Sequence, residues 1–194
     1  MKKLNLTQTK MTYRGAQSIF NATQRFSTLK ELTLNKNSLD GFKLRNIREM
    51  LSNNKGLIAL HLNQCQLGEW GAVYLALGLE NNRTLKTLNV ADNNFGDEGM
   101  EYLTQSMINH RGFSLSHWDL SQNYISDVQG VKIAEGLAEN NTLEYLSLQS
   151  NTLTMETGQA FKTLMQTHTK LAKIDLSKNL VPLSCVNEIN KVCD

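Results

Sequence analysis

The chain has 194 residues, of which 40% are hydrophobic, and its 20 basic and 18 acidic side chains leave a net charge of +2. Charges of both signs are interspersed along the sequence, so composition gives no support for binding to nucleic acid or to a membrane surface. No apolar run approaches the roughly 20 residues that a membrane span needs. Residues 1–5 lead directly into a strand pattern, so a secretory signal peptide is not expected.

One phrase, L-x-x-L-x-L-x-x-(N/C/T)-x-(L/I/F/V/M), recurs through nearly the whole sequence. A copy without its leading leucine occupies 4–11, and the complete copies begin at Leu29, Leu57, Leu85, Leu115, Leu143 and Leu171. The steps between the leading leucines are 28, 28, 30, 28 and 28 residues. A period of this size indicates a solenoid, in which each unit buries its apolar face only by stacking on a neighbour.

Each repeat is predicted to contain a strand followed by a helix. The L-x-L part of the phrase alternates between core and solvent, as a short strand does. Segments such as 71–79 and 130–138 carry apolar residues at three- and four-residue spacing, which predicts amphipathic helices. Parallel strands lie about 4.8 Å apart, whereas packed helices lie about 8–10 Å apart. The array must therefore bend into an α/β solenoid, with parallel strands on its concave face and helices on its convex face.

Polar residues recur at two fixed places in this pattern. Asn, Thr9 or Cys65 follows each strand, where we expect it to bond loop backbone groups that would otherwise be buried without partners. Asn–Asn pairs at 53–54, 81–82 and 140–141 follow three predicted helices. We expect these pairs to end the helices because asparagine tolerates the left-handed conformation. Cys65 is predicted to be structural, since no histidine is placed by the sequence to activate it.

The chain is predicted to form a single domain over 1–194, with about seven repeats. No Pro-, Gly- or Ser-rich linker divides it. Pro182 interrupts the strand pattern of the last repeat, and 182–194 is predicted to form a C-terminal capping helix. Three cysteines without a C-x-x-C pair fit a reducing compartment, so a cytoplasmic location is expected.

The phrases at 67–71, 93–99 and 140–143 resemble the ribonuclease-inhibitor type of leucine-rich repeat, and the resemblance covers essentially the whole chain. It implies a right-handed horseshoe that binds a folded protein across the concave face and the loops that follow the strands. Members include enzyme inhibitors, GTPase activators, immune sensor domains, actin-end capping domains and effectors of intracellular bacteria. The chain is shorter than the inhibitor and uses a single 28-residue unit, so a ribonuclease target is not implied. It looks more like a bacterial effector or effector regulator, which would act in the host cytosol.

The outward strand positions form a grid of mostly small or polar residues. His117, Asp119 and Tyr145 stand out as neighbours on adjacent strands, and tyrosine is among the residues that supply most interface energy. The other predicted partner-binding residues lie on nearby outward positions or on strand-to-helix loops: Trp70, Asp92, Gln122, Tyr124, Gln149, Lys173, Asp175 and Lys178.

The area of the strand face argues that loops also take part in binding. Seven strands span about 29 Å and five strand residues about 17 Å, so the flat face covers about 500 Å². A standard interface buries about 800 Å² on each partner. We therefore predict a module that is monomeric before complex formation and masks a functional surface of a protein partner, acting as an inhibitor or regulator.

Activation of a small GTPase is the leading alternative, because such activators can supply an arginine finger. No arginine occupies an outward strand position, and the candidates lie on predicted helices or loops: Arg14, Arg25, Arg45, Arg48, Arg83 and Arg111.

Chemistry by this chain itself is not expected. Ser121, Asp119 and His117 share one strand at alternate positions about 6.6–7 Å apart, which places them beyond hydrogen-bond reach. His61 and His117 lie two repeats apart, about 10 Å, whereas zinc ligands lie about 2 Å from their ion. No phosphate-binding glycine motif follows a strand. We therefore predict no metal and no cofactor.

Overall fold

The computed structural model describes residues 2–40, 44–109, 113–167 and 170–193. Strands and helices alternate along these residues. The strands are β1 (Lys3–Asn5), β2 (Glu31–Thr33), β3 (Ala59–His61), β4 (Thr87–Asn89), β5 (His117–Asp119), β6 (Tyr145–Ser147) and β7 (Lys173–Asp175). The helices are α1 (Tyr13–Arg25), α2 (Asn46–Asn53), α3 (Gly68–Leu79), α4 (Gly96–Asn109), α5 (Asp127–Leu137), α6 (Met155–Met165) and α7 (Leu183–Cys193).

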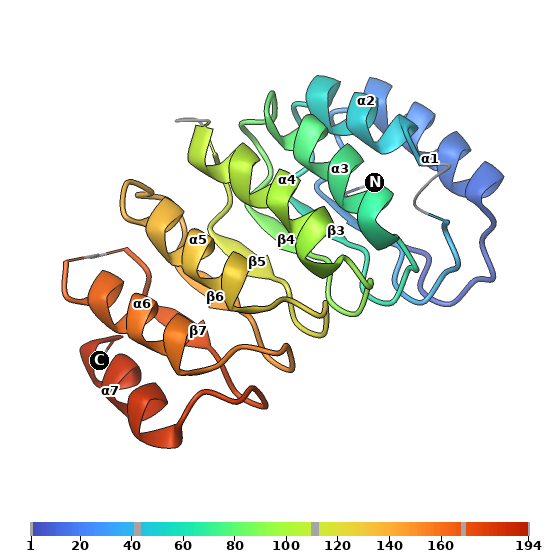
Figure 1. The fold of residues 1–194 in the computed structure, drawn as a ribbon. Helices are drawn as coiled ribbons and strands as arrows, with labels where there is room; N and C mark the ends of the chain where they lie inside the picture. Colours follow the sequence, from blue (N-terminus) through green and yellow to red (C-terminus); the bar gives the residue numbers. More distant parts are fainter. Residues whose placement is uncertain (1, 41–43, 110–112, 168–169, 194) are drawn as a thin grey trace.

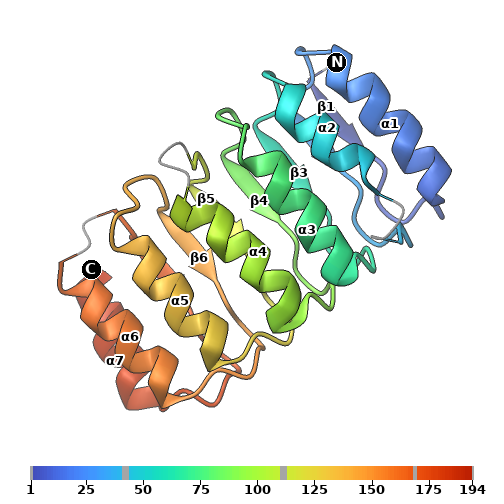
Figure 2. The ribbon, with the colours of Figure 1, turned by 45° about the horizontal axis from the view of Figure 1, so that its top comes forward.

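The strands form one parallel sheet in chain order, from β1 to β7. Figures 1 and 2 show the strands in one layer and the helices in a second, outer layer that steps along a curved path from the N-terminus to the C-terminus. Each helix packs on the next one in the chain. The predicted α/β solenoid is therefore confirmed. Each repeat is numbered by its strand, so that repeat 5 contains β5.

The register aligns equivalent residues of successive repeats. The middle residues of the strands pair as Leu32 with Leu60, Leu60 with Leu88 and Leu88 with Trp118, and they are fully buried. The 30-residue step between Leu88 and Trp118 therefore adds its extra residues outside the strand and leaves the register unchanged. The result is a set of straight rows across the sheet, both inside and on the exposed face.

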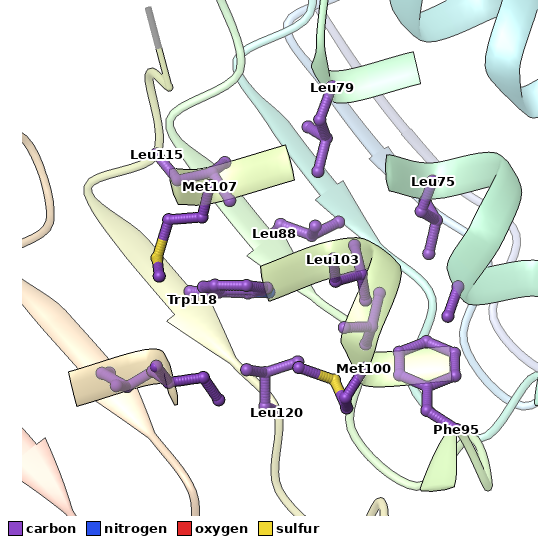
Figure 3. Close-up of a cluster of buried hydrophobic side chains, with 14 of the residues drawn as sticks. Leu75, Leu79, Leu88, Phe95, Met100, Leu103, Met107, Leu115, Trp118 and Leu120 are labelled. Carbon is purple, nitrogen blue, oxygen red and sulfur yellow. The ribbon is translucent and has the colours of Figure 1, made fainter. Parts of the chain in front are cut away.

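The core lies between the two layers, as Figure 3 shows for repeats 3 to 5. Trp118 takes the place of a strand leucine in the recurring phrase, and it points into the core near Met107 and Leu120 and is fully buried. Its ring centroid lies 5.6 Å from that of Phe113. Helices α5 and α6 approach closely at Gly130, where an added Cβ would lie 2.3 Å from Thr157 Oγ1.

A row of asparagines, all buried except the half-buried Asn179, joins consecutive turns after the strands. At Asn93, Oδ1 accepts from the backbone N–H groups of Cys65 (2.9 Å) and Leu67 (3.3 Å), while Nδ2 donates to the carbonyls of Leu62 (2.8 Å) and Val90 (2.9 Å). The predicted role of this position is confirmed by the same kind of bonding at Asn37, Asn123, Asn151 and Asn179.

The expected mechanism of the Asn–Asn pairs is wrong. Asn54 follows α2 with extended backbone (φ −71°, ψ 127°), not with a left-handed one. The second asparagine instead works through its side chain: Asn82 Oδ1 accepts from the backbone N–H groups of Thr84 (2.9 Å) and Leu85 (2.8 Å), and Nδ2 donates to the carbonyl of Leu51 (2.7 Å). These bonds fix the helix-to-strand turn and join it to the preceding repeat.

Candidate protein-binding surface

The first outward position of each strand places His117, Tyr145 and Lys173 side by side on β5, β6 and β7. The His117 and Tyr145 ring centroids lie 6.0 Å apart with their planes inclined by 29°. Lys173 Nζ lies 5.7 Å from the centroid of the Tyr145 ring. His117 and Lys173 are exposed, and Tyr145 is half-buried between them. We call these three residues the concave row; it presents a stacked aromatic pair beside a cation.

Asp119 was predicted as a contact residue, but its carboxylate is bonded within the chain. Oδ2 accepts from Asn89 Nδ2 (2.9 Å), and Oδ1 accepts from both the backbone N–H (3.0 Å) and the hydroxyl (2.6 Å) of Ser121. Asp119 therefore orders the end of its strand and the neighbouring strand rather than offering an unbonded carboxylate.

The expectation that Ser121 lies beyond reach of Asp119 is thus wrong, because the chain turns at the end of β5 and brings the two side chains together. The buried Ser121 hydroxyl also lies 2.7 Å from Ser147 Oγ. His117 Nδ1 lies 3.0 Å from the hydroxyl of its own neighbour, Ser116. The Ser121 hydroxyl therefore bonds to Asp119 and lies within hydrogen-bond distance of Ser147. Among the residues that the structure describes, it forms no hydrogen bond with His117 of the kind that a nucleophile–base pair requires.

Other predicted polar residues are bonded between neighbouring strands. Gln64 Nε2 donates to Asp92 Oδ2 (2.7 Å). Gln149 Nε2 donates to Ser177 Oγ (2.9 Å) and lies 3.5 Å from Asp175 Oδ2. The other carboxylate oxygen of Asp175, Oδ1, accepts from the backbone N–H of Ser177 (2.9 Å). The polar part of the concave face is therefore an ordered network, which leaves little side-chain freedom to lose on binding.

Gln122, Tyr124 and Lys178 lie in the turns that follow β5 and β7. Each has a left-handed backbone, with φ of 56°, 58° and 57°. Gln122 and Tyr124 flank the buried Asn123, and Lys178 precedes the half-buried Asn179 of the same row. All three side chains are exposed. The Tyr124 ring, 67% exposed, lies on the outside of its turn as the sequence predicts.

Four exposed apolar residues at the same edge were missed by the sequence reasoning: Val128, Met155, Leu180 and Leu183. The sequence contained a signal for one of them, Leu180. Leu180 occupies the position that follows the row asparagine, which is polar in repeats 2, 3, 4 and 6. The other three are at helix starts, where an apolar residue is equally consistent with packing.

Trp70 lies elsewhere on the surface. It is half-exposed in the first turn of α3, and its ring centroid lies 6.4 Å from that of Tyr74 on the same helix. Trp70 belongs to repeat 3, whose strand β3 lies two strands away from β5, the strand of His117. Trp70 is also part of the helix layer and not of the sheet. The structure does not bring Trp70 together with the concave row.

The described arginines lie off the concave strands. Arg14, Arg25 and Arg48 belong to α1 and α2, and Arg45 precedes α2. Arg83 Nη1 donates to the carbonyls of Glu80 (2.8 Å) and Asn82 (3.0 Å) in the turn after α3. Arg111 lies outside the described residues. Within the described ranges, no group of three or more His, Cys, Asp or Glu side chains is arranged to hold a metal ion.

Cys65 is fully buried in the row of turn residues, where its thiol donates to the Leu34 carbonyl (3.3 Å). Burial raises the pKa of this thiol to about 11, although backbone groups of Asn37 and Lys36 oppose the shift. A thiol with a raised pKa is a poor nucleophile at neutral pH. This fits the structural role that the sequence predicts.

Across the parts of the chain that the structure describes, no helix is both long enough and apolar enough to cross a membrane. The family described as "Leucine Rich repeat" matches residues 81–103 and 139–161. No curated protein matches the chain.

Two solved structures are reported as similar to the chain, and only the first of them has a TM-score above 0.5. The leiomodin-1 actin-binding site 2 is 16% identical, with 92% of this chain and 88% of that chain covered and a TM-score of 0.54. A protein from Bacteroides fragilis is 12% identical, with 94% and 67% covered and a TM-score of 0.48. At 16% identity the likeness to the leiomodin-1 structure concerns the fold alone. The recurring phrase, the parallel sheet with its outer helices and the match of two segments to the family model show that the chain has the fold of a leucine-rich-repeat solenoid.

Proposed function

We propose that this protein binds a folded protein partner through the concave row and the adjoining strand-to-helix loops, and that it thereby covers a functional surface of that partner, such as an active cleft. In this role the protein is an inhibitor or regulator of its partner and performs no chemistry of its own. The observation that carries the proposal is the concave row itself, in which His117, Tyr145 and Lys173 are held in contact on three adjacent strands.

The surroundings of the row support this proposal. Asp119 and Ser121 bond to each other and to neighbouring strands, so the platform beneath the partner is ordered before binding. A pre-ordered surface loses little conformational entropy in the complex. Tyrosine at the centre of an interface is also a frequent source of binding energy.

The repeat type is part of the same proposal. We infer a ribonuclease-inhibitor-type repeat that acts in a cytoplasm, and for a bacterial effector or effector regulator this would be the host cytosol. The resemblance of the phrases at 67–71 and 93–99 supports this inference.

Activation of a small GTPase has less support, because none of the described arginines lies on a concave strand. Nucleotide turnover measured with candidate GTPases, with and without the chain, separates the two functions. Faster hydrolysis would favour activation.

The experiment that tests masking begins with affinity purification of partners and cross-linking of the complex, followed by mass spectrometry. We expect cross-links from Lys173 and Lys178 to the partner, and we expect the partner's activity to fall as the complex forms. Cross-links confined to the outer faces of α2 to α5, with the partner's activity unchanged, would contradict the proposal. A Tyr145→Ala variant is the matched test of the row, because it removes the ring and leaves the charge of the surface unchanged.

A further inference from the structure

The core of the solenoid is open at the end formed by repeat 1. Leu4 in β1 is half-buried, whereas its register partner Leu32 in β2 is fully buried. At the opposite end α7 contacts β7, and the equivalent residue Ile174 is only 3% exposed. Figure 2 shows β1 and α1 at the N-terminal end of the array. In the parts of the chain that the structure describes, repeat 1 therefore has a neighbouring repeat on one side only.

A pocket of about 240 Å³ lies at this open end. It is formed by β1, α1 and the turn that leads to β2, and its apolar lining residues are Leu4, Ile19, Ala22, Phe26 and Leu29. Phe26 is 63% exposed. Sites for small molecules usually measure about 300–1,000 Å³, so this pocket is sized for one or two apolar side chains.

The open end also presents an unpaired strand edge. The Leu6 N–H donates to the Thr33 carbonyl (2.8 Å), and the Lys2 carbonyl accepts from the first residue of β2 (3.1 Å). Alternate residues of a strand direct these groups to opposite sides, so Lys3 and Asn5 direct theirs away from β2. No strand of the described ranges pairs with that side of β1. Such an edge can bind a further extended segment.

Charge distinguishes repeat 1 from the rest of the chain. Residues 1–30 contain six of the 20 basic side chains and none of the 18 acidic ones: Lys2, Lys3, Lys10, Arg14, Arg25 and Lys30. Because the whole chain carries only +2, the other repeats together are net acidic. Arg25 and Lys30 are exposed and directly adjoin the pocket residues Phe26 and Leu29 in the sequence. The open end therefore attracts an acidic partner.

We propose that the open end of repeat 1 binds an extended, acidic segment of a protein, which adds a strand to β1 and places an apolar side chain in the pocket. Main-chain bonds to Lys3 and Asn5 hold this segment, and its acidic side chains meet Arg25 and Lys30. The inference goes beyond the proposed function, because the concave row lies on β5 to β7 and not on repeat 1.

The edge, the pocket and the charge together favour this partner over two others. A second copy of the chain would bring a second basic end against the first, and like charges in contact are unfavourable. Lysines on an edge strand discourage the same pairing. The phosphates of a nucleic acid would match the charge but would leave the strand edge and the apolar pocket unused.

The test selects peptides from a displayed random library on the immobilised full chain, with a length of about 12 residues, which is enough for one strand. Enriched peptides are synthesised, and their affinities for the unmodified chain and its variants are measured by fluorescence anisotropy. Ala22→Trp fills the pocket from an exposed position on α1, and Ala138→Trp at the end of α5 is its control. Lys30→Glu reverses one charge at the open end. Its control is Lys86→Glu, because Lys86 occupies the same exposed position in repeat 4.

Asn5→Pro tests the added strand itself. Proline lacks the outward N–H of Asn5, whereas the bonds between β1 and β2 come from the alternate residues and remain. Amide hydrogen exchange of the unmodified chain, followed by NMR with and without peptide, tests the same bonds without a substitution. Thermal melting confirms that each variant is folded.

We expect enriched peptides in which acidic and apolar residues alternate. They bind Ala22→Trp, Lys30→Glu and Asn5→Pro at least tenfold more weakly than the unmodified chain, and they bind the two controls unchanged. In the complex, the amides of Lys3 and Asn5 exchange at least tenfold more slowly.

Absence of enriched peptides, equal binding to Ala22→Trp, or unchanged exchange of the Lys3 and Asn5 amides overturns the inference. Two further results also overturn it. Sedimentation velocity that finds a dimer abolished by Ala22→Trp would assign the open end to a second copy. A short oligothymidine whose binding weakens in Lys30→Glu but not in Ala22→Trp would assign it to nucleic acid. The proposed function fails separately, when an identified partner binds Tyr145→Ala as tightly as the unmodified chain.

Discussion

The rings of His117 and Tyr145 face each other across the β5–β6 pair, with centroids 6.0 Å apart, because their backbones are register partners in the parallel sheet. Neither residue determines this contact by itself. The buried row of Leu88, Trp118 and Leu146 fixes the register, and the exposed residues follow it. Each residue of the concave row therefore has a known equivalent in the neighbouring repeats, and the effects of substitutions at equivalent positions can be compared.

Replacing Tyr145 by Ala is expected to weaken partner binding by about 2 kcal/mol or more, which is about a 30-fold rise in Kd. The change removes the ring that contacts both His117 and Lys173. Isothermal titration calorimetry with the isolated partner measures the effect, and Tyr102→Ala, which removes a similar ring from α4, is the control. We also expect Tyr124→Ala to weaken binding, whereas Trp70→Ala is expected to change it little, because Trp70 lies on α3 and not with the concave row. Undiminished affinity in both the Tyr145 and the Tyr124 variant would refute the predicted surface.

Replacing Asn82 by Ala is expected to lower the free energy of unfolding by about 3 kcal/mol. The change leaves the Leu51 carbonyl and the N–H groups of Thr84 and Leu85 without the partners they have now, and each unsatisfied buried group costs about 1–3 kcal/mol before relaxation. Asn81→Ala is the matched control, since Asn81 is exposed and a surface change alters stability by about 0.5 kcal/mol or less. Urea unfolding of both variants checks the difference. Equal stability of the two would show that the side-chain bonds do not hold this turn.

Replacing Cys65 by Asn is expected to stabilise the protein by about 1 kcal/mol. An asparagine there can accept from the backbone of repeat 2 and donate to two carbonyls, as Asn93 does in the next repeat. The thiol now bonds the Leu34 carbonyl at 3.3 Å and the Asn63 carbonyl at 3.5 Å. Urea unfolding of Cys65→Asn and Cys65→Ala is the measurement, and we expect the alanine variant to be less stable than the unmodified chain. An asparagine variant below the unmodified chain would contradict the expectation.

Glu101 gives a pH-dependent contribution to stability. Hydrogen bonds from Lys132 and Gln129 lower the pKa of its carboxyl to about 2, below the unfolded value of 4.5, against a smaller effect of burial. A carboxyl whose pKa is lower in the folded state stabilises the fold above its unfolded pKa, and the contribution disappears as the pH falls from about 4.5 to about 2.

The two side chains are each more than one-third exposed, so solvent screening limits the effect to less than about 1 kcal/mol. We expect Lys132→Met to be slightly less stable than the unmodified chain at pH 7 and equal to it near pH 2. Urea unfolding at both values measures the difference. A difference that persists at pH 2 would assign it to packing instead of charge.

Much of the fold could be predicted from the sequence because the repeat states the same information several times. Six complete copies of one phrase determine the strand, its inward residues and the polar turn residue, and a parallel stack is the arrangement that buries them all. Trp118 could be placed inward for that reason, since it replaces a leucine of the phrase. The same rows predicted that His117 and Tyr145 would be neighbours, and they are.

Local backbone geometry and side-chain pairing were decided only by the tertiary structure. The side chains of Asn54 and Asn82 hold their helix-to-strand turns by hydrogen bonds to carbonyls of the preceding repeat. The propensity of asparagine for a left-handed backbone does not predict these bonds. Asp119 and Ser121 meet because the chain turns after β5, and a uniform strand spacing misses this contact. Periodicity thus determined which residues face the core, whereas hydrogen bonds between repeats decided which outward polar groups are already bonded. The physical reason is that burial follows a repeating pattern along the chain, but bonding depends on atoms that only the stacked neighbours bring within reach.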